Sequence, residues 1–194
     1  MTSRMESAAA TRRALLEAAD ALLDLGGPEA VTLREVGARA GMTRGAPYRH
    51  FADKETLLIA VGARAWQDIE ERARALAADP ALTPAERLRA NLAAVVDIAR
   101  TRPYLYELMF SRPAGDPEAL VRAARGSNEV FVETVAALVG ERDARRYGAL
   151  LMAGVDGIAN LEAGGQLDGE KWGTSADELI DTLVAMVARH GANG

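Results

Sequence analysis

Two arginines and a tyrosine are spaced so that one face of a short helix would carry all three side chains. At about 100° per residue, Arg44, Tyr48 and Arg49 fall within roughly 140° of one another, together with Gly45. Arginine can donate two hydrogen bonds to O6 and N7 of guanine, and a tyrosine hydroxyl can reach a phosphate or a base edge. Because Gly45 would let the backbone approach a duplex closely, this pattern predicts a surface that reads the major groove of DNA.

The residues before this face predict a helix-turn-helix. Thr32 is placed to cap a first short helix, Gly41 supplies the tight turn that ends it, and Thr43 is placed to cap the second helix. Gly37 lies one helical turn before Gly41, where a missing side chain lets two helices cross closely. The alternative is a helical hairpin that merely belongs to a core.

Residues at the two ends of the second helix modify this surface. Pro47 removes one helical hydrogen bond and disfavours helical angles at Ala46, so the helix could begin as a looser turn. Beyond it, His50 and Lys54 flank the reading face and could bind phosphates. Asp53 is placed to cap the next helix, whose N-terminal N–H groups would form a further anion site.

The chain as a whole is acidic, with a formal net charge of −5, which at first sight argues against DNA binding. Between residues 34 and 54, however, five basic side chains are set against two acidic ones, so this segment carries +3. Phosphate neutralisation depends on that local potential rather than on the total charge. For Arg34 and Arg39 a solvated helix face is an equal alternative, and Arg44 or Arg49 could singly make no base contact.

Residues 32–57 resemble the DNA-binding region of the TetR family of bacterial transcriptional regulators. The match comprises Thr32, Val36, Gly37, Ala40, Gly41, Thr43, Gly45, Tyr48, His50, Phe51, Lys54 and Leu57. Mild departures fall at Gly37, Met42 and Pro47, where the family more often has alanine, valine and leucine. The residue pattern and the resemblance together predict a DNA-contacting set consisting of Thr32, Thr43, Arg44, Gly45, Ala46, Tyr48, Arg49, His50 and Lys54.

The hydrophobic periodicity of the chain predicts an all-α fold with no strand. We expect residues 1–55 to form a three-helix DNA-binding domain with the helix-turn-helix, and residues 56–194 to form a larger helical domain for effector binding and dimerisation. The expected helices cover residues 8–25, 54–78, 84–101, 104–110, 118–139, 143–163 and 175–189, besides the short reading pair, and residues 164–173 form a loop.

The last two long helices are predicted to form a partner surface. Their apolar and small residues are Leu179, Ile180, Leu183, Val184 and Val187 on one helix and Gly154 and Gly157 on the other. Two such helices from each of two subunits would make a four-helix bundle, which is also how the TetR family usually dimerises. A homodimer would present two recognition helices to a pseudo-palindromic operator in double-stranded DNA. The alternative is that both helices pack wholly within one subunit.

Aromatic, methionine and polar side chains of the larger domain could line a cavity for a small molecule. The candidate effector-binding residues are Trp66, Tyr104, Met109, Phe110, Asn128, Met152, Asp156 and Asn160. Asn91 and Asp97 are further polar residues in apolar helical segments. Ordinary core or exposed positions are the alternative for each. The family resemblance implies a small organic effector that releases DNA.

Composition excludes several other classes of function. The 194 residues contain no cysteine, so disulfides and thiol chemistry are excluded, and His50 and His190 are too isolated to suggest a metal site. We expect no cofactor and no enzyme activity, because phosphate-loop, zinc-protease and serine-hydrolase motifs are missing. Without a long apolar run or a signal-peptide pattern, we expect a cytoplasmic protein with no membrane partner.

The sequence therefore predicts a transcriptional regulator, most simply a repressor that a small organic effector releases from its operator. The alternative is a helical ligand-binding or scaffold protein without specific DNA binding.

Overall fold

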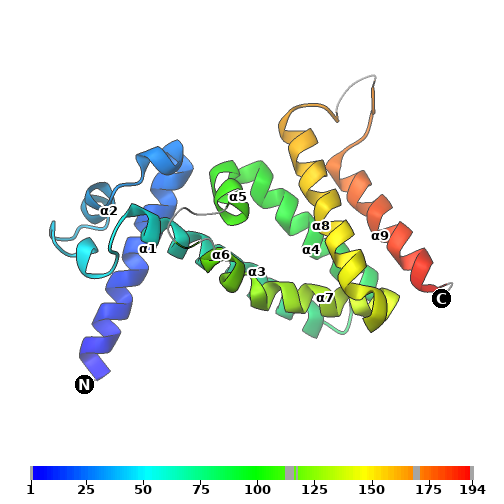
Figure 1. The fold of residues 1–194 in the computed structure, drawn as a ribbon, viewed down its shortest axis with the longest axis horizontal. Helices are drawn as coiled ribbons and strands as arrows, with labels where there is room; N and C mark the ends of the chain where they lie inside the picture. Colours follow the sequence, from blue (N-terminus) through cyan, green and yellow to red (C-terminus); the bar gives the residue numbers. More distant parts are fainter. Residues whose placement is uncertain (1, 112–115, 117, 168–170, 193–194) are drawn as a thin grey trace. The chain divides into compact units, whose positions relative to one another are not determined.

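The computed structural model describes residues 2–111, 116, 118–167 and 171–192, and every regular element in that range is helical (Figure 1). The elements are α1 (Thr2–Ala30), α2 (Leu33–Arg39), the 3-10 helix η1 (Pro47–Arg49), α3 (Lys54–Ala78), α4 (Pro84–Thr101), α5 (Pro103–Phe110), α6 (Ala119–Ala123), α7 (Arg125–Val139), α8 (Glu141–Ala163) and α9 (Ala176–Ala192). The predicted all-α fold class is confirmed.

The chain forms two compact units that are not contiguous in sequence. Unit 1 takes its residues from 1–65 and 103–123, so it contains α1, α2, η1, the first part of α3, α5 and α6. Unit 2 takes its residues from 66–102 and 124–194 and contains the rest of α3 together with α4, α7, α8 and α9. The boundary predicted between residues 55 and 56 concerns function and not compactness, and it stays a prediction.

The end of α1 follows from its two glycines. Gly26 and Gly27 have non-helical angles, and the φ of Gly27 is +68°, which favours a residue without a side chain. A Cβ at Gly27 would also lie 2.9 Å from Cε1 of Tyr104 in α5. The regular helix therefore stops where the sequence predicts, and Pro28 to Ala30 add one further turn.

Local capping signals mark the starts of α4 and α9 in unit 2. Thr83 and Glu86 form a reciprocal capping box at α4: the Glu86 N–H donates to the Thr83 hydroxyl, and the Thr83 N–H donates to the Glu86 carboxylate. Ser175 and Glu178 repeat this arrangement at α9. Helix α4 packs against α7, α8 and α9, and its buried face supplies much of the core of this unit.

The single helix predicted over residues 118–139 is wrong, because the structure breaks it at Ala124. The Ala124 carbonyl accepts hydrogen bonds from the N–H of Asn128 and from the hydroxyl of Ser127. Glycine at 126 weakens the helix here, and a side chain at this position would overlap the carboxylate of Glu70 on α3. The Ala124 carbonyl therefore accepts the first backbone hydrogen bond of α7, and Gly126 leaves room for the Glu70 carboxylate.

Candidate DNA-binding and effector sites

The first half of the predicted helix-turn-helix has the expected geometry. The N–H of Glu35 donates to the Thr32 hydroxyl at 3.1 Å, which confirms Thr32 as the cap of α2. At the other end Gly41 has a φ of +67°. The N–H of Met42 donates to the Gly37 carbonyl at 2.9 Å, which closes the turn as a Schellman motif.

The second half is a turn rather than the predicted helix. Regular structure begins only at Pro47 and lasts three residues, as the 3-10 helix η1. Thr43 therefore does not cap a helix: its carbonyl accepts the N–H of Ala46 in a preceding turn. Pro47 has no N–H to donate, which removes one helical hydrogen bond here. The prediction that it would keep Ala46 from helical angles is wrong, because Ala46 has a φ of −65° and a ψ of −45°.

Pro47 and Phe51 anchor this turn in the core of unit 1. The ring of Pro47 lies against α2 at Gly37, where an added Cβ would be 2.8 Å from Cγ of the ring. The close approach predicted at Gly37 is therefore observed, but its partner is Pro47 of η1 and not a second α-helix. The Phe51 ring is buried, and the Arg12 guanidinium carbon lies 5.2 Å from its centroid.

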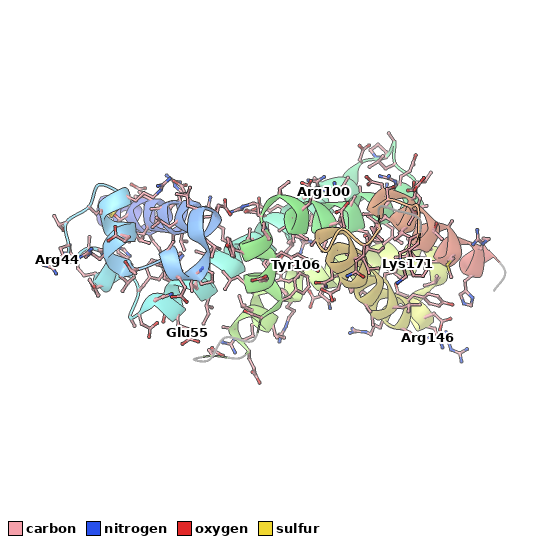
Figure 2. The ribbon with its side chains drawn as sticks, turned by 90° about the horizontal axis from the view of Figure 1, so that it is seen from above. Arg44, Glu55, Arg100, Tyr106, Arg146 and Lys171 are labelled. Carbon is pink, nitrogen blue, oxygen red and sulfur yellow. The ribbon has the colours of Figure 1, made fainter. Side chains whose placement is uncertain are left out.

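Residues 44–49, called here the reading segment, present the predicted side chains to solvent. Arg44, Gly45 and Arg49 are exposed, and Tyr48 is 56% exposed. Figure 2 shows the Arg44 side chain pointing away from the protein. Neither Arg44 nor Arg49 has an ion-pair partner among the residues that the structure describes. Ala46, in contrast, is buried under the segment, so its own side chain is not on the reading face.

Other members of the predicted DNA-contacting set lie around the reading segment. Thr32 and Thr43 are exposed, and His50 is half-buried. The ammonium Nζ of Lys54 lies 3.6 Å from a carboxylate oxygen of Glu29. The N–H of Thr56 donates to Asp53 at 2.7 Å, which confirms Asp53 as the cap of α3, and this hydrogen bond lowers the pKa of Asp53.

The candidate effector residues are divided between the two units. In unit 1, Met109 is buried, whereas Tyr104 and Phe110 remain partly exposed. In unit 2, Trp66 and Met152 are half-buried, while Asn128, Asp156 and Asn160 are exposed. The Asn160 amide donates to the Asp156 carbonyl of its own helix at 2.7 Å. Their role as a ligand-binding set stays a prediction.

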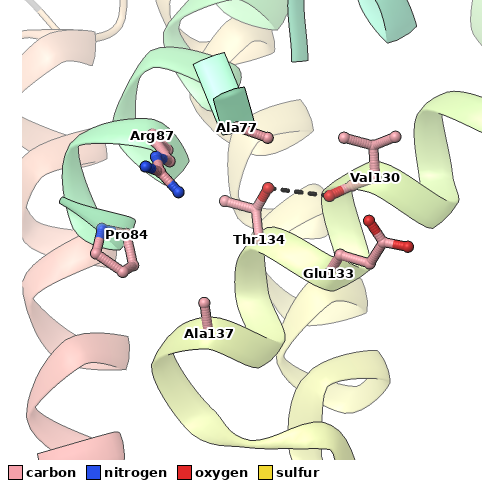
Figure 3. A pocket seen from close by; sticks show the side chains of 7 residues that line it. All are labelled: Ala77, Pro84, Arg87, Val130, Glu133, Thr134 and Ala137. Carbon is pink, nitrogen blue, oxygen red and sulfur yellow. Dashed lines mark hydrogen bonds between the residues drawn. The ribbon is translucent and has the colours of Figure 1, made fainter. Parts of the chain in front are cut away.

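A small cavity of unit 2 has a different lining from the predicted one (Figure 3). Its volume is about 110 Å³, and it is bounded by Ala77, Pro84, Arg87, Val130, Glu133, Thr134 and Ala137. Arg87 donates to the Asp79 carbonyl at 2.6 Å, but its Nε has no hydrogen-bond partner among the described residues. This lining could not be predicted from the sequence, because Arg87 looks like any other charged residue of an amphipathic helix.

Asn91 lies one helical turn after Arg87 and is the buried member of the polar residues noted in the sequence. Its amide Nδ2 is shut off from solvent and finds no hydrogen-bond partner in the described part of the chain. An unsatisfied buried donor costs about 1–3 kcal/mol, so such groups usually meet a ligand or an ordered water.

Two sequence matches decide the family of this chain. Residues 15–61 match the bacterial regulatory proteins of the tetR family, and residues 88–187 match the tetracyclin repressor-like C-terminal domain. The second match alone spans more than half of the chain. The chain belongs to the TetR family. It is thus a DNA-binding transcriptional regulator and not an enzyme, as the sequence predicted.

Several known proteins and solved structures are similar to this chain. The HTH-type transcriptional repressor KstR of Rhodococcus jostii (strain RHA1) is 35% identical over 98 residues, which are 50% of this chain and 45% of KstR. The match therefore spans less than half the length of that relative. A protein of unknown function from Rhodococcus sp. RHA1 is 28% identical, with a TM-score of 0.75 over 92% of this chain and 94% of the other.

The fold is shared with more distant regulators as well. FadR from Bacillus subtilis, solved in complex with stearoyl-CoA, has a TM-score of 0.69 at 15% identity, over 92% of this chain and 98% of that one. In the part of the chain that the structure describes, no helix is long and apolar enough to cross a membrane. The same residues contain no cluster of three or more side chains able to hold a metal ion.

Proposed function

We propose that this TetR-family regulator is a cytoplasmic repressor that binds a pseudo-palindromic operator as a homodimer and is released by a small organic effector. The observation that carries the DNA-binding part is the reading segment. Its arginines are exposed and have no ion-pair partners among the described residues. They lie on a turn that the buried residues Pro47 and Phe51 hold in place. Such arginines are available for bidentate contacts with guanine.

The roles within the predicted DNA-contacting set follow from these surroundings. Arg44 and Tyr48 would contact base edges, and Arg49 would contact either a base or a phosphate. Lys54 would bind a phosphate together with the N-terminal N–H groups of α3. The Glu29 carboxylate already lies beside the Lys54 ammonium. A phosphate that binds Lys54 must therefore replace Glu29 as its ion-pair partner.

The proposed dimer uses the outward faces of α8 and α9. Ile180, Val184 and Val187 are buried within the subunit, so only part of the predicted apolar stripe remains for a partner. Leu150 on α8 and Met186 on α9 supply further apolar surface for a partner, because these residues are 60% and 56% exposed. Two copies joined through these helices would place two reading segments on one operator.

The proposed effector site lies among the helices of unit 2. Its candidates there include Trp66 and Met152, and Asn91 adds a buried amide N–H that could donate to a ligand oxygen. FadR from Bacillus subtilis, which shares this fold, was solved in complex with stearoyl-CoA, so an acyl-CoA is a first candidate effector to test.

Recovery of bound fragments from sheared genomic DNA tests this function. The purified protein should enrich fragments with a two-fold symmetric motif, whose half-sites lie about 34–36 Å apart or at multiples of that spacing. A variant with Arg44→Ala and Arg49→Ala, both exposed in the structure, serves as the folded control and should enrich none of them. If the wild-type protein enriches nothing over input, the helical binding or scaffold protein becomes the better interpretation.

A further inference from the structure

We propose that Gly37 and Pro47 form a positioning pair that determines the position of the reading segment relative to α2. The ring of Pro47 occupies the space that a side chain at Gly37 would fill, and the exposed side chains of the segment take their positions from that contact. This inference rests on the proposed DNA-binding function, since it concerns how the reading side chains are presented.

The contact between the two residues leaves no room for even one methyl group. A Cβ at Gly37 would lie 2.8 Å from Cγ and 3.4 Å from Cδ of Pro47, and both residues are buried. The proline ring cannot swing away as a long side chain would, because it is closed onto its own backbone. An alanine at position 37 therefore requires Pro47 or α2 to shift.

The backbone of Pro47 is also the point to which the reading segment is tied. Its carbonyl accepts the N–H groups of His50 and Phe51, both at 3.0 Å. Phe51 is buried in the core of unit 1, so the downstream end of the segment is fixed. A displacement at Pro47 is consequently taken up by residues 44–49, which carry Arg44 and Tyr48.

Gly37 has no conformational need to be glycine. It lies inside α2, and its φ is not positive. Alanine is the better helix former at such a position, so Gly37→Ala should favour α2 itself while it disturbs the contact with Pro47. The effect of the pair on DNA recognition can therefore be separated from helix stability.

A double-mutant cycle tests the pair: wild type, Gly37→Ala, Pro47→Ala and the double variant. Affinity for an operator fragment recovered with the wild-type protein and for random DNA is measured by fluorescence anisotropy. Overpacking of a tight contact predicts that Gly37→Ala weakens operator binding by about tenfold, with less than about threefold change on random DNA. In the double variant the ring atoms that clash are gone, so its affinity should return to within about threefold of Pro47→Ala.

Equal operator affinity of Gly37→Ala and wild type would overturn the proposal, and so would strictly additive losses in the double variant. If circular dichroism shows that the Gly37→Ala protein is unfolded, amide hydrogen exchange of the Pro47→Ala protein is measured instead. Amides of residues 48–51 should then exchange faster than in wild type, and unchanged exchange overturns the pair. Absence of any preferred operator for the wild-type protein would instead contradict the proposed function, so the two failures are distinguishable.

Discussion

Arg44 and Lys54 have different surroundings, and from this difference we expect separate tasks in the proposed DNA binding. The Arg44 guanidinium is exposed, with no ion-pair partner in the described part of the chain. The Lys54 ammonium, in contrast, lies beside the Glu29 carboxylate. A free guanidinium can meet a guanine in two hydrogen bonds, whereas a partnered ammonium mainly exchanges one anion for another.

Replacing Arg44 with alanine should therefore affect recognition more than general affinity. We expect Arg44→Ala to weaken operator binding by about 1–3 kcal/mol and to relax discrimination at one base pair. Anisotropy titrations on operator and random DNA measure both effects, with Arg13→Ala on α1 as an exposed control. Equal losses on both DNAs would refute a base-reading role for Arg44.

Lys54 and Glu29 should act on all DNA sequences alike. Lys54→Ala is expected to lower affinity uniformly and to reduce the salt dependence of binding by about one charge. Glu29→Gln should do the reverse and strengthen binding, because it removes the carboxylate that competes with phosphate for Lys54. Titrations at several salt concentrations measure the slopes. A Lys54→Ala protein with an unchanged slope would place Lys54 outside the phosphate contacts.

At the scale of elements, three helices begin on a carboxylate that accepts backbone N–H groups. Asp53 serves α3, Glu86 serves α4 and Glu178 serves α9. Hydrogen bonding lowers the pKa of all three: from Thr56 to Asp53, from Thr83 to Glu86, and from Ser175 to Glu178. Their charged forms are therefore stabilised more in the folded chain than in the unfolded one.

The sign of these pKa shifts predicts a loss of stability in acid. The contribution of Asp53 is present above its ordinary pKa of 3.8 and disappears as the pH falls through the lowered value of the folded state. Asp53→Asn keeps a capping oxygen but cannot titrate there. Thermal unfolding from pH 7 to pH 3 should therefore show a shallower decline for Asp53→Asn than for wild type. Parallel declines would mean that Asp53 does not contribute to the acid sensitivity.

The bounds of α3 and α4 could be predicted from the sequence because their signals are local. A capping side chain, an apolar period and a terminating residue all lie within one segment at each helix. The break at Ala124 could not be predicted in this way, since the cap position of α7 is an alanine that makes no side-chain hydrogen bond. The unsatisfied Nε of Arg87 and the cavity beside it are products of tertiary packing.

The reading segment could be predicted from the sequence only in part. Its exposed arginines and tyrosine were predicted from spacing alone, but spacing also predicted a helix where the structure has turns and η1. Gly37 and Pro47 are both departures from the usual TetR-family pattern, and they contact each other. The sequence contains both departures but does not show that one accommodates the other.

At the scale of the whole molecule, the proposed dimer can be tested without disturbing the subunit. Leu150 is 60% exposed, so Leu150→Glu should cost little folding stability, whereas in a dimer it would bury an unpaired charge. We expect monomers in sedimentation velocity and weaker operator binding. Val121→Glu on α6, where the side chain is 69% exposed, is the matched control. A folded Leu150→Glu protein that still sediments as a dimer would place the interface elsewhere.

An effector that releases DNA must also obey thermodynamic reciprocity. If it lowers operator affinity by some factor, typically about 5–150-fold, operator must lower effector affinity by the same factor. Calorimetric titration of an effector found by thermal-shift screening, with and without operator present, measures this coupling. Met152→Trp, which adds bulk at a half-buried candidate position, should abolish it and leave DNA binding intact. Identical effector affinities in the two titrations would show that binding and release are not linked.

The composition of unit 1 limits how this regulator could be recombined with others. Its core includes Leu105, Leu108 and Met109 of α5, which packs on α1. Gly62 of α3 provides the space that Leu120 of α6 fills. A gene fragment that ends soon after α3 begins would encode the reading segment without these side chains. Exchange of DNA specificity between homologues by a single crossover would therefore produce an incomplete core, so new specificities are more accessible through point substitutions within the reading segment.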